Sequence, residues 1–153
     1  MLSANEFTVG SIGQATPLSL VLPRHEHEET ILIGKCLGGT AAFFLGDRER
    51  FKWFESSGNN HWHGLIIPNV RIEVDEASIF DPGRTEAKPG TVIRHGTQLI
   101  AKAKSLTASR DLDPIILEDG LTETSQEHAG FFRWQVVVGF DSNRRVLHAV
   151  SAG

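Results

Sequence analysis

The stretch TILIGKCLGGTAAFFL, residues 30–45, holds two apolar runs on either side of a glycine pair. Residues 30–37 are rich in β-branched side chains, and residues 40–45 contain two phenylalanines. β-branched and aromatic residues favour strands, and a short connection that contains glycine joins antiparallel neighbours. The stretch therefore predicts a β-hairpin around Gly38-Gly39.

The same pattern recurs along the whole chain, where short apolar runs alternate with glycine, proline, asparagine and aspartate. Residues 70–74 alternate between apolar and polar side chains, and residues 91–104 do so for most of their length. Residues 134–140 and 146–150 are two further apolar runs, joined by the turn-forming sequence Asp141-Ser142-Asn143-Arg144. A period of two residues and short connections indicate antiparallel β-strands.

We expect a single all-β domain over residues 1–153, built as one antiparallel β-sandwich or β-barrel. The apolar runs amount to about eight to ten short strands. At most one short helix is expected, as a single turn within the polar residues 121–130. Long helices are missing from the pattern, which excludes parallel βαβ winding. Asp111-Leu112-Asp113 is expected to be a loop rather than a cation site.

The composition excludes several classes of protein. The net charge is −4 and the basic residues are scattered, so nothing in the charge favours a nucleic-acid partner. Cys36 is the single cysteine and cannot form an internal disulfide. No apolar run approaches the length of about 20 residues that a membrane helix needs, and the first residues lack a signal region. We therefore expect a cytoplasmic protein without a membrane partner.

Two histidine triplets are the strongest chemical signal: His25-Glu26-His27 and His61-Trp62-His63. Residues i and i+2 of a strand point to the same face, so each triplet could present two imidazoles side by side. Two histidines from one strand and a third from elsewhere are the usual protein ligands of a catalytic zinc, and carboxylates nearby also suit iron or manganese. His95 is the third candidate ligand.

The first triplet resembles the metal-binding pattern of cupins, which are double-stranded β-barrels. His25 and His27 match the His-X-His of that pattern, Glu29 lies near its acid, and His95 lies near its later histidine. The resemblance implies a metal-binding barrel or a metal-dependent enzyme. Upstream, where cupins have a glycine, this chain has Ser19. The opposite interpretation of residues 24–29 is a solvated turn, because the run is uniformly polar and follows a proline.

The second triplet stands at the step from a polar loop into an apolar strand. There, Trp62 would pack inward, and His61 and His63 would face the other side. Aromatic residues are also frequent between positions 43 and 62, which predicts core packing or, less commonly, the wall of a ligand site. The candidate ligand-binding residues are Asn60, His61, Trp62 and His63. The alternative is that both histidines are simply exposed at a strand start.

Two functions from different classes follow from these features. The favoured one is a non-enzymatic domain without a cofactor, which binds a small molecule or a protein and can self-associate as a homo-oligomer. The alternative is a small cupin-like enzyme or metal-binding barrel that holds zinc, iron or manganese with some of His25, His27, His61, His63 and His95.

Other chemistry has weaker support in the sequence. No Gly-X-Ser-X-Gly elbow is present, and Cys36 lies in an apolar strand, where a thiol is usually inert. Glu73 and Asp75 share a strand face and could form an acid–base pair, although a solvated face is more common. A pH response is a third hypothesis, because protonation of the seven histidines would reverse the sign of the net charge of −4.

Overall fold

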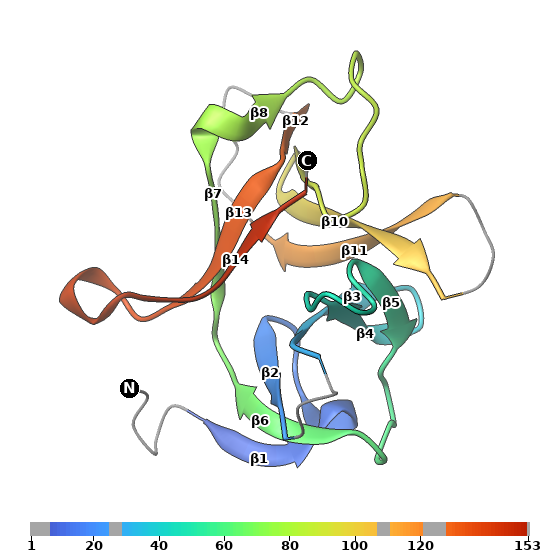
Figure 1. Ribbon diagram of the computed structural model, residues 1–153, viewed down its shortest axis with the longest axis vertical. Coiled ribbons are helices and arrows are strands. Elements are labelled where there is room, and N and C mark those ends of the chain that lie inside the picture. Colours follow the sequence, from blue (N-terminus) through green and yellow to red (C-terminus); the bar gives the residue numbers. More distant parts are fainter. Residues whose placement is uncertain (1–6, 25–28, 107–110, 121–127, 153) are drawn as a thin grey trace.

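A computed structural model describes residues 7–24, 29–106, 111–120 and 128–152, and it confirms an all-β fold (Figure 1). The first seven strands are β1 (Thr8–Ser11), β2 (Ser19–Pro23), β3 (Ile31–Cys36), β4 (Gly39–Phe44), β5 (Lys52–Glu55), β6 (His63–Ile67) and β7 (Arg71–Val74). The others are β8 (Ile79–Phe80), β9 (Val92–His95), β10 (Gln98–Ser105), β11 (Leu112–Asp119), β12 (His128–Phe131), β13 (Arg133–Val138) and β14 (Arg145–Ser151). Three short 3-10 turns stand between strands: η1 (Ile12–Gln14), η2 (Glu76–Ser78) and η3 (Asp141–Asn143).

Five strands form a closed ring of hydrogen-bonded neighbours, in the order β3, β4, β5, β10 and β11, with β11 pairing to β3 again. Gly34 permits this closure, because a Cβ there would lie 2.6 Å from Ile115 Cγ2 and 2.9 Å from the carbonyl oxygen of Ile116. The sheet continues from β3 through β2 and β6 to β1, and from β10 through β9 and β12 to β8. The fold therefore has a closed barrel core with additional strands on both sides.

Both predicted hairpins are confirmed. β3 and β4 pair antiparallel from Ile31 opposite Phe44 to Cys36 opposite Gly39, so the chain turns at the glycine pair. β13 and β14 also pair antiparallel, and they form a separate three-stranded sheet with β7. In Figure 1 the tip of this hairpin, in orange and red, projects away from the ring.

The predicted strand number is wrong: the described residues contain 14 strands rather than about eight to ten. β1, β8 and β12 have two to four residues each, which is too short to show a period of two. Residues 91–104 are two strands, not one, because Gly96, with a φ of +58°, and Thr97 turn the chain between β9 and β10.

Two further expectations need correction. The pairing is not antiparallel throughout, since β5 and β10 are parallel, with Lys52 opposite Lys104. The long segment between these two strands lets β10 return in the same direction. The expected loop at residues 111–113 is largely strand, because Leu112 and Asp113 belong to β11. The Asp113 carboxylate accepts a hydrogen bond of 2.8 Å from the indole Nε1 of Trp53. The helical turn expected within residues 121–130 concerns residues 121–127, which lie outside the described residues.

The β3–β4 hairpin buries both of its faces, and each face belongs to a different core. The large core lies within the ring and extends to the three-stranded sheet, and its members include Leu32, Ala41, Phe43, Ala101, Ile115, Trp134 and Val136. The small core lies on the other face, and its buried members are Ile12, Ala15, Val21, Ile31, Ile33, Ala42, Phe44 and Ile66. Successive residues of a strand point to opposite faces, so Phe43 and Phe44 enter different cores.

None of the helical turns in the described part of the chain comes near the length and apolarity of a membrane-crossing helix.

Candidate functional site

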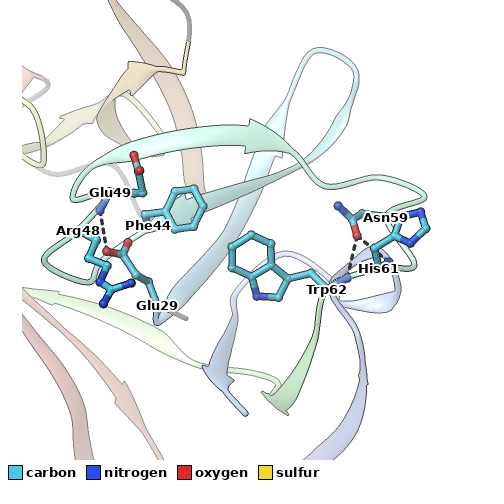
Figure 2. Close-up of a pocket in the computed structure, with 7 residues that line it drawn as sticks. All are labelled: Glu29, Phe44, Arg48, Glu49, Asn59, His61 and Trp62. Atoms are coloured by element: carbon cyan, nitrogen blue, oxygen red, sulfur yellow. Dashed lines mark hydrogen bonds between the residues drawn. The ribbon is translucent and has the colours of Figure 1, made fainter. Parts of the chain in front are cut away.

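A cleft of about 450 Å³ opens at the edge of the small core, and its size is in the range of small-molecule sites. Three segments build it: Glu29, just before β3; the end of β4 with the turn after it; and the loop that leads into β6. The lining residues are Glu29, Phe44, Arg48, Glu49, Asn59, His61 and Trp62 (Figure 2).

Aromatic rings form the apolar wall of this cleft. Phe44 is buried and Trp62 is half-buried, and their ring centroids lie 5.7 Å apart. Phe54 completes the cluster, at 5.6 Å from Phe44 and 5.9 Å from Trp62. Rings in such tilted and stacked pairs stabilise one another beyond the area they bury. In Figure 2 the rings of Phe44 and Trp62 lie between two polar ends of the cleft.

The carboxylate of Glu29 lies at one polar end. Its side chain is the one charged side chain that is buried among the described residues, at 8% exposure. Oε1 accepts a hydrogen bond of 2.6 Å from the backbone N–H of Glu49, whereas Oε2 is buried and accepts none from the described residues. A buried carboxylate oxygen without a donor is energetically costly. Among the described residues, the Oε2 atom of Glu29 is therefore the unsatisfied acceptor at this end of the cleft.

The turn after β4 creates the space that Glu29 occupies. A Cβ at Gly46 would lie 2.9 Å from the Cβ of Glu29 and 3.0 Å from its Cγ, so glycine leaves the room that this side chain needs. The turn also brings Arg48 and Glu49 to the cleft. The Glu49 carboxylate lies 2.7 Å from Nζ of Lys52, so it already has a cationic partner.

Asn59 and His61 form the other polar end. The side-chain oxygen of Asn59 accepts hydrogen bonds from the backbone N–H groups of His61, at 3.0 Å, and Trp62, at 3.1 Å. Such a turn fixes the backbone without any strand pairing. The loop is also tied to η1, because Ile12 N–H donates to the Trp62 carbonyl at 2.9 Å and Gly13 N–H donates to the Asn59 carbonyl at 2.9 Å. These bonds hold the indole of Trp62 against the small core.

The structure brings together two of the four candidate ligand-binding residues. Trp62 packs inward and lines the cleft with His61, which is exposed. Asn60 is exposed and is not among the lining residues, and His63 is exposed at the start of β6, opposite Ser11. The sequence pointed to Asn60, whereas its neighbour Asn59 makes the turn. The aromatic cluster around residues 43–62 was a signal for Phe44, but nothing local marked Arg48 or Glu49.

The candidate metal ligands do not form a cluster among the described residues. His25 and His27 lie outside these residues, and no group of three His, Cys, Asp or Glu side chains within them has a geometry that could hold a metal ion. His61 and His63 lie near β6, whereas His95 ends β9 on the other side of the ring. The contact of His95 is with His128, on the neighbouring strand.

Glu73 and Asp75 line a second cleft of about 490 Å³, beside the three-stranded sheet. Hydrogen bonds from Arg144 hold the pKa of Glu73 below its usual value, and Arg133 does the same for the pKa of Asp75. The bonds run from Arg144 Nε to both carboxylate oxygens of Glu73, at 3.1 and 3.0 Å, and from Arg133 Nε to Asp75 at 2.9 Å. Both carboxylates thus stay ionised at neutral pH, which suits an ion-paired face better than acid–base chemistry.

Comparison with known proteins identifies a family. The family model of the uncharacterised protein y4lG matches residues 9–153 of this chain. The uncharacterized protein y4lG of Sinorhizobium fredii (strain NBRC 101917 / NGR234) is 45% identical over 147 residues, which are 96% of this chain and 91% of that protein. No solved structure matches the chain. The chain therefore belongs to the Y4lG family.

Proposed function

We propose that this chain is a non-enzymatic binding domain, and that its ligand is a small molecule with a planar apolar group and a cationic or N–H donor group. One observation carries the proposal: a half-buried indole, Trp62, and a buried carboxylate, Glu29, line the same cleft. The first offers a surface for stacking, and the second offers an oxygen that lacks a donor. A cleft with an apolar wall and a few polar groups at its ends is the usual form of a small-molecule site.

The charges around the cleft favour a cationic ligand over an anionic one. Two carboxylates, Glu29 and Glu49, face one guanidinium, Arg48, among the lining residues. The Glu49 carboxylate has an ion-pair partner in Lys52, whereas Oε2 of Glu29 is buried and has no hydrogen-bond donor in the described part of the chain. An ammonium or amidinium group that reached the Glu29 carboxylate would give Oε2 a charge-assisted hydrogen bond. A carboxylate ligand would meet repulsion at the same position.

Stacking supplies the second half of the recognition. Trp62 is held in place by the rings of Phe44 and Phe54 and by two hydrogen bonds of its own backbone: its N–H donates to the Asn59 side-chain oxygen, and its carbonyl accepts from the Ile12 N–H. A ring that is fixed before binding loses little conformational entropy when a ligand covers it. A flat aromatic ligand therefore fits this wall better than a flexible aliphatic one.

The test uses two probes of the same shape and opposite charge, benzamidine and benzoate. Binding is followed through the NMR signals of the Trp62 indole, with the Trp53 indole as an internal reference, because Trp53 packs against the large core and bonds to Asp113. We expect benzamidine to shift the Trp62 signals and benzoate to leave them unchanged. Glu29→Gln should weaken benzamidine binding by about 10-fold or more, since a hydrogen bond to a charged group contributes about 1.5–3 kcal/mol.

A matched pair of tryptophan variants completes the experiment. Trp62→Leu should abolish the response to benzamidine, whereas Trp53→Leu should retain it, because only Trp62 lines the cleft among the tryptophans. Equal binding of benzamidine and benzoate, or benzamidine binding that survives both Glu29→Gln and Trp62→Leu, would contradict the proposal. Self-association and a protein partner remain predictions from the sequence, and so does the metal-binding alternative.

A further inference from the structure

We propose a second site, unrelated to the cleft: a copper(II) site formed by the imidazoles of His95 and His128. The two Nδ1 atoms lie 3.0 Å apart, and the ring planes are nearly perpendicular, at 86°. Both side chains are exposed, so an ion in solvent can reach them. His95 was a candidate ligand in the sequence, whereas His128 carried no local signal because it stands alone in the chain.

The strands hold the two histidines opposite each other. His95 ends β9 and His128 begins β12, and the two residues are direct partners in the antiparallel register. β9 also pairs with β10 on its other edge, where His95 lies opposite Gln98. The next positions along both strands, Arg94 and Ala129, are paired as well. The backbone on which the two imidazoles stand is therefore fixed before any ion binds, which limits the entropic cost of binding.

The separation of the nitrogens matches the requirement of one metal ion. An imidazole nitrogen binds a metal at about 2.0–2.1 Å, so two adjacent ligands at right angles lie about 2.9 Å apart. Two ligands of a tetrahedral ion would lie about 3.3 Å apart at the same bond lengths. The observed 3.0 Å lies between these two values, so one ion can reach both nitrogens. Copper(II) is the divalent ion of the first transition row that nitrogen ligands bind most tightly.

The protonation of the pair is compatible with this role. Two nitrogens at 3.0 Å share one hydrogen, so one Nδ1 donates and the other accepts in the absence of metal. Binding an ion through both Nδ1 atoms requires the donating imidazole to carry its hydrogen on Nε2 instead, which is the other neutral tautomer. No further His, Cys, Asp or Glu side chain completes a cluster of three around the pair among the described residues. Water would therefore fill the remaining coordination positions.

The experiment titrates copper(II) sulfate into the full chain, purified without a histidine tag, and measures affinity by calorimetry and ligand type by electron paramagnetic resonance. We expect one copper ion per chain with a signal from two nitrogen ligands. His95→Ala and His128→Ala should each weaken binding by at least about 10-fold, because even the loss of an outer-shell partner costs about 10–100-fold in metal affinity. His61→Ala with His63→Ala is the matched control and should leave this affinity unchanged.

A measurement on the unaltered chain keeps the test independent of folding defects. Copper(II) is paramagnetic, so a stoichiometric amount should broaden the NMR signals of the His95 and His128 rings before those of the other histidines. The proposal is overturned if copper broadens another set of histidines first. It is overturned equally if the single variants bind copper as tightly as the original chain, or if only a His25→Ala, His27→Ala variant loses it.

Discussion

The two faces of the β3–β4 hairpin are covered differently: one is enclosed by other strands, and the other borders an open cleft. On one face, the side chain of Phe43 is fully buried and lies 6.0 Å from the ring of Phe51, and the strands of the ring enclose it. On the other face, Phe44 is buried to a similar degree, yet it lines an open cleft beside a half-buried indole and a buried carboxylate. Both faces have the same strands and the same register. The difference therefore comes from what is packed on top of the hairpin.

This comparison shows where a binding site can form in a fold of this size. The large core is closed by strands from distant parts of the chain, including the three-stranded sheet. The small core is covered by η1, the loop before β6 and the turn after β4, which meet without closing over Trp62 and Glu29. Loops at the end of a rigid sheet can leave such a space without loss of the main core.

The largest expected effect separates the two cores directly. Phe43→Ala should lower the free energy of unfolding by about 3–5 kcal/mol, because the closed set of five strands cannot collapse into the cavity that the missing phenyl group leaves. Phe44→Ala should cost at least about 1 kcal/mol less, since water can enter the space from the cleft. Urea denaturation of both variants measures the difference. Equal losses for the two neighbours would mean that the small core is as tightly closed as the large one.

The second effect concerns the closure of the ring. Gly34→Ala should lower the free energy of unfolding by about 1–3 kcal/mol, because its Cβ would press against the Ile115 side chain and the Ile116 carbonyl. Gly10→Ala is the matched control in β1, where the new Cβ meets mainly the flexible end of Gln14 and should change stability by no more than about 0.5 kcal/mol. If the two alanines cost the same by urea denaturation, β11 does not approach β3 as closely as described.

The sequence predicted the parts of this fold that depend on local pattern. Alternation gave the correct buried face of β10, with Leu99, Ala101 and Ala103 inside, and glycine and Asp-Ser-Asn turns gave both hairpins. It did not predict the parallel contact of β5 with β10, because such a pairing depends on where a long intervening segment places the two strands. A strand as short as β8 has no recognisable pattern of its own, because it is defined only by its pairing with β12.

The candidate site was predictable to a similar extent. Trp62 and His61 stood out because they mark the step from a polar loop into an apolar strand. Glu29 entered only through the resemblance to cupins, as a metal-binding acid, because its sequence neighbours are uniformly polar. Its burial results from the turn that folds over it at Gly46, which no pattern around Glu29 indicates. Sites built from separate loops are hidden from a local reading for this reason.

The third prediction concerns Gly46, whose substitution should change the free energy of unfolding less than the two changes above but should also weaken ligand binding. Gly46→Ala places a methyl group where the Glu29 side chain lies, so Glu29 must shift, at a cost of about 1 kcal/mol. The displaced carboxylate should lose its hydrogen bond to the Glu49 backbone, and benzamidine binding should fall together with it. NMR titration of this variant beside the original chain measures both effects. Unchanged benzamidine affinity would show that the position of Glu29 is not critical.

The smallest effect is a pH dependence at the contact between the three-stranded sheet and the same turn. The pKa of His148 lies below its usual 6.5, chiefly because the imidazole is partly buried. A hydrogen bond to the Leu45 backbone opposes this shift, and the charges of Arg50, which lowers the pKa, and Asp47, which raises it, have smaller effects. Because the folded state binds this proton less readily than the unfolded state, the contribution of His148 to stability is complete above pH 6.5 and declines as the pH falls below it. Urea midpoints of the original chain and of His148→Gln are measured above pH 6.5 and well below it. The difference between the two proteins isolates the contribution of His148, since the other six histidines are common to both. The original chain should lose more stability on acidification than the variant. Parallel losses would mean that the turn at Leu45 leaves His148 in contact with water and that the sheet is not packed against this turn.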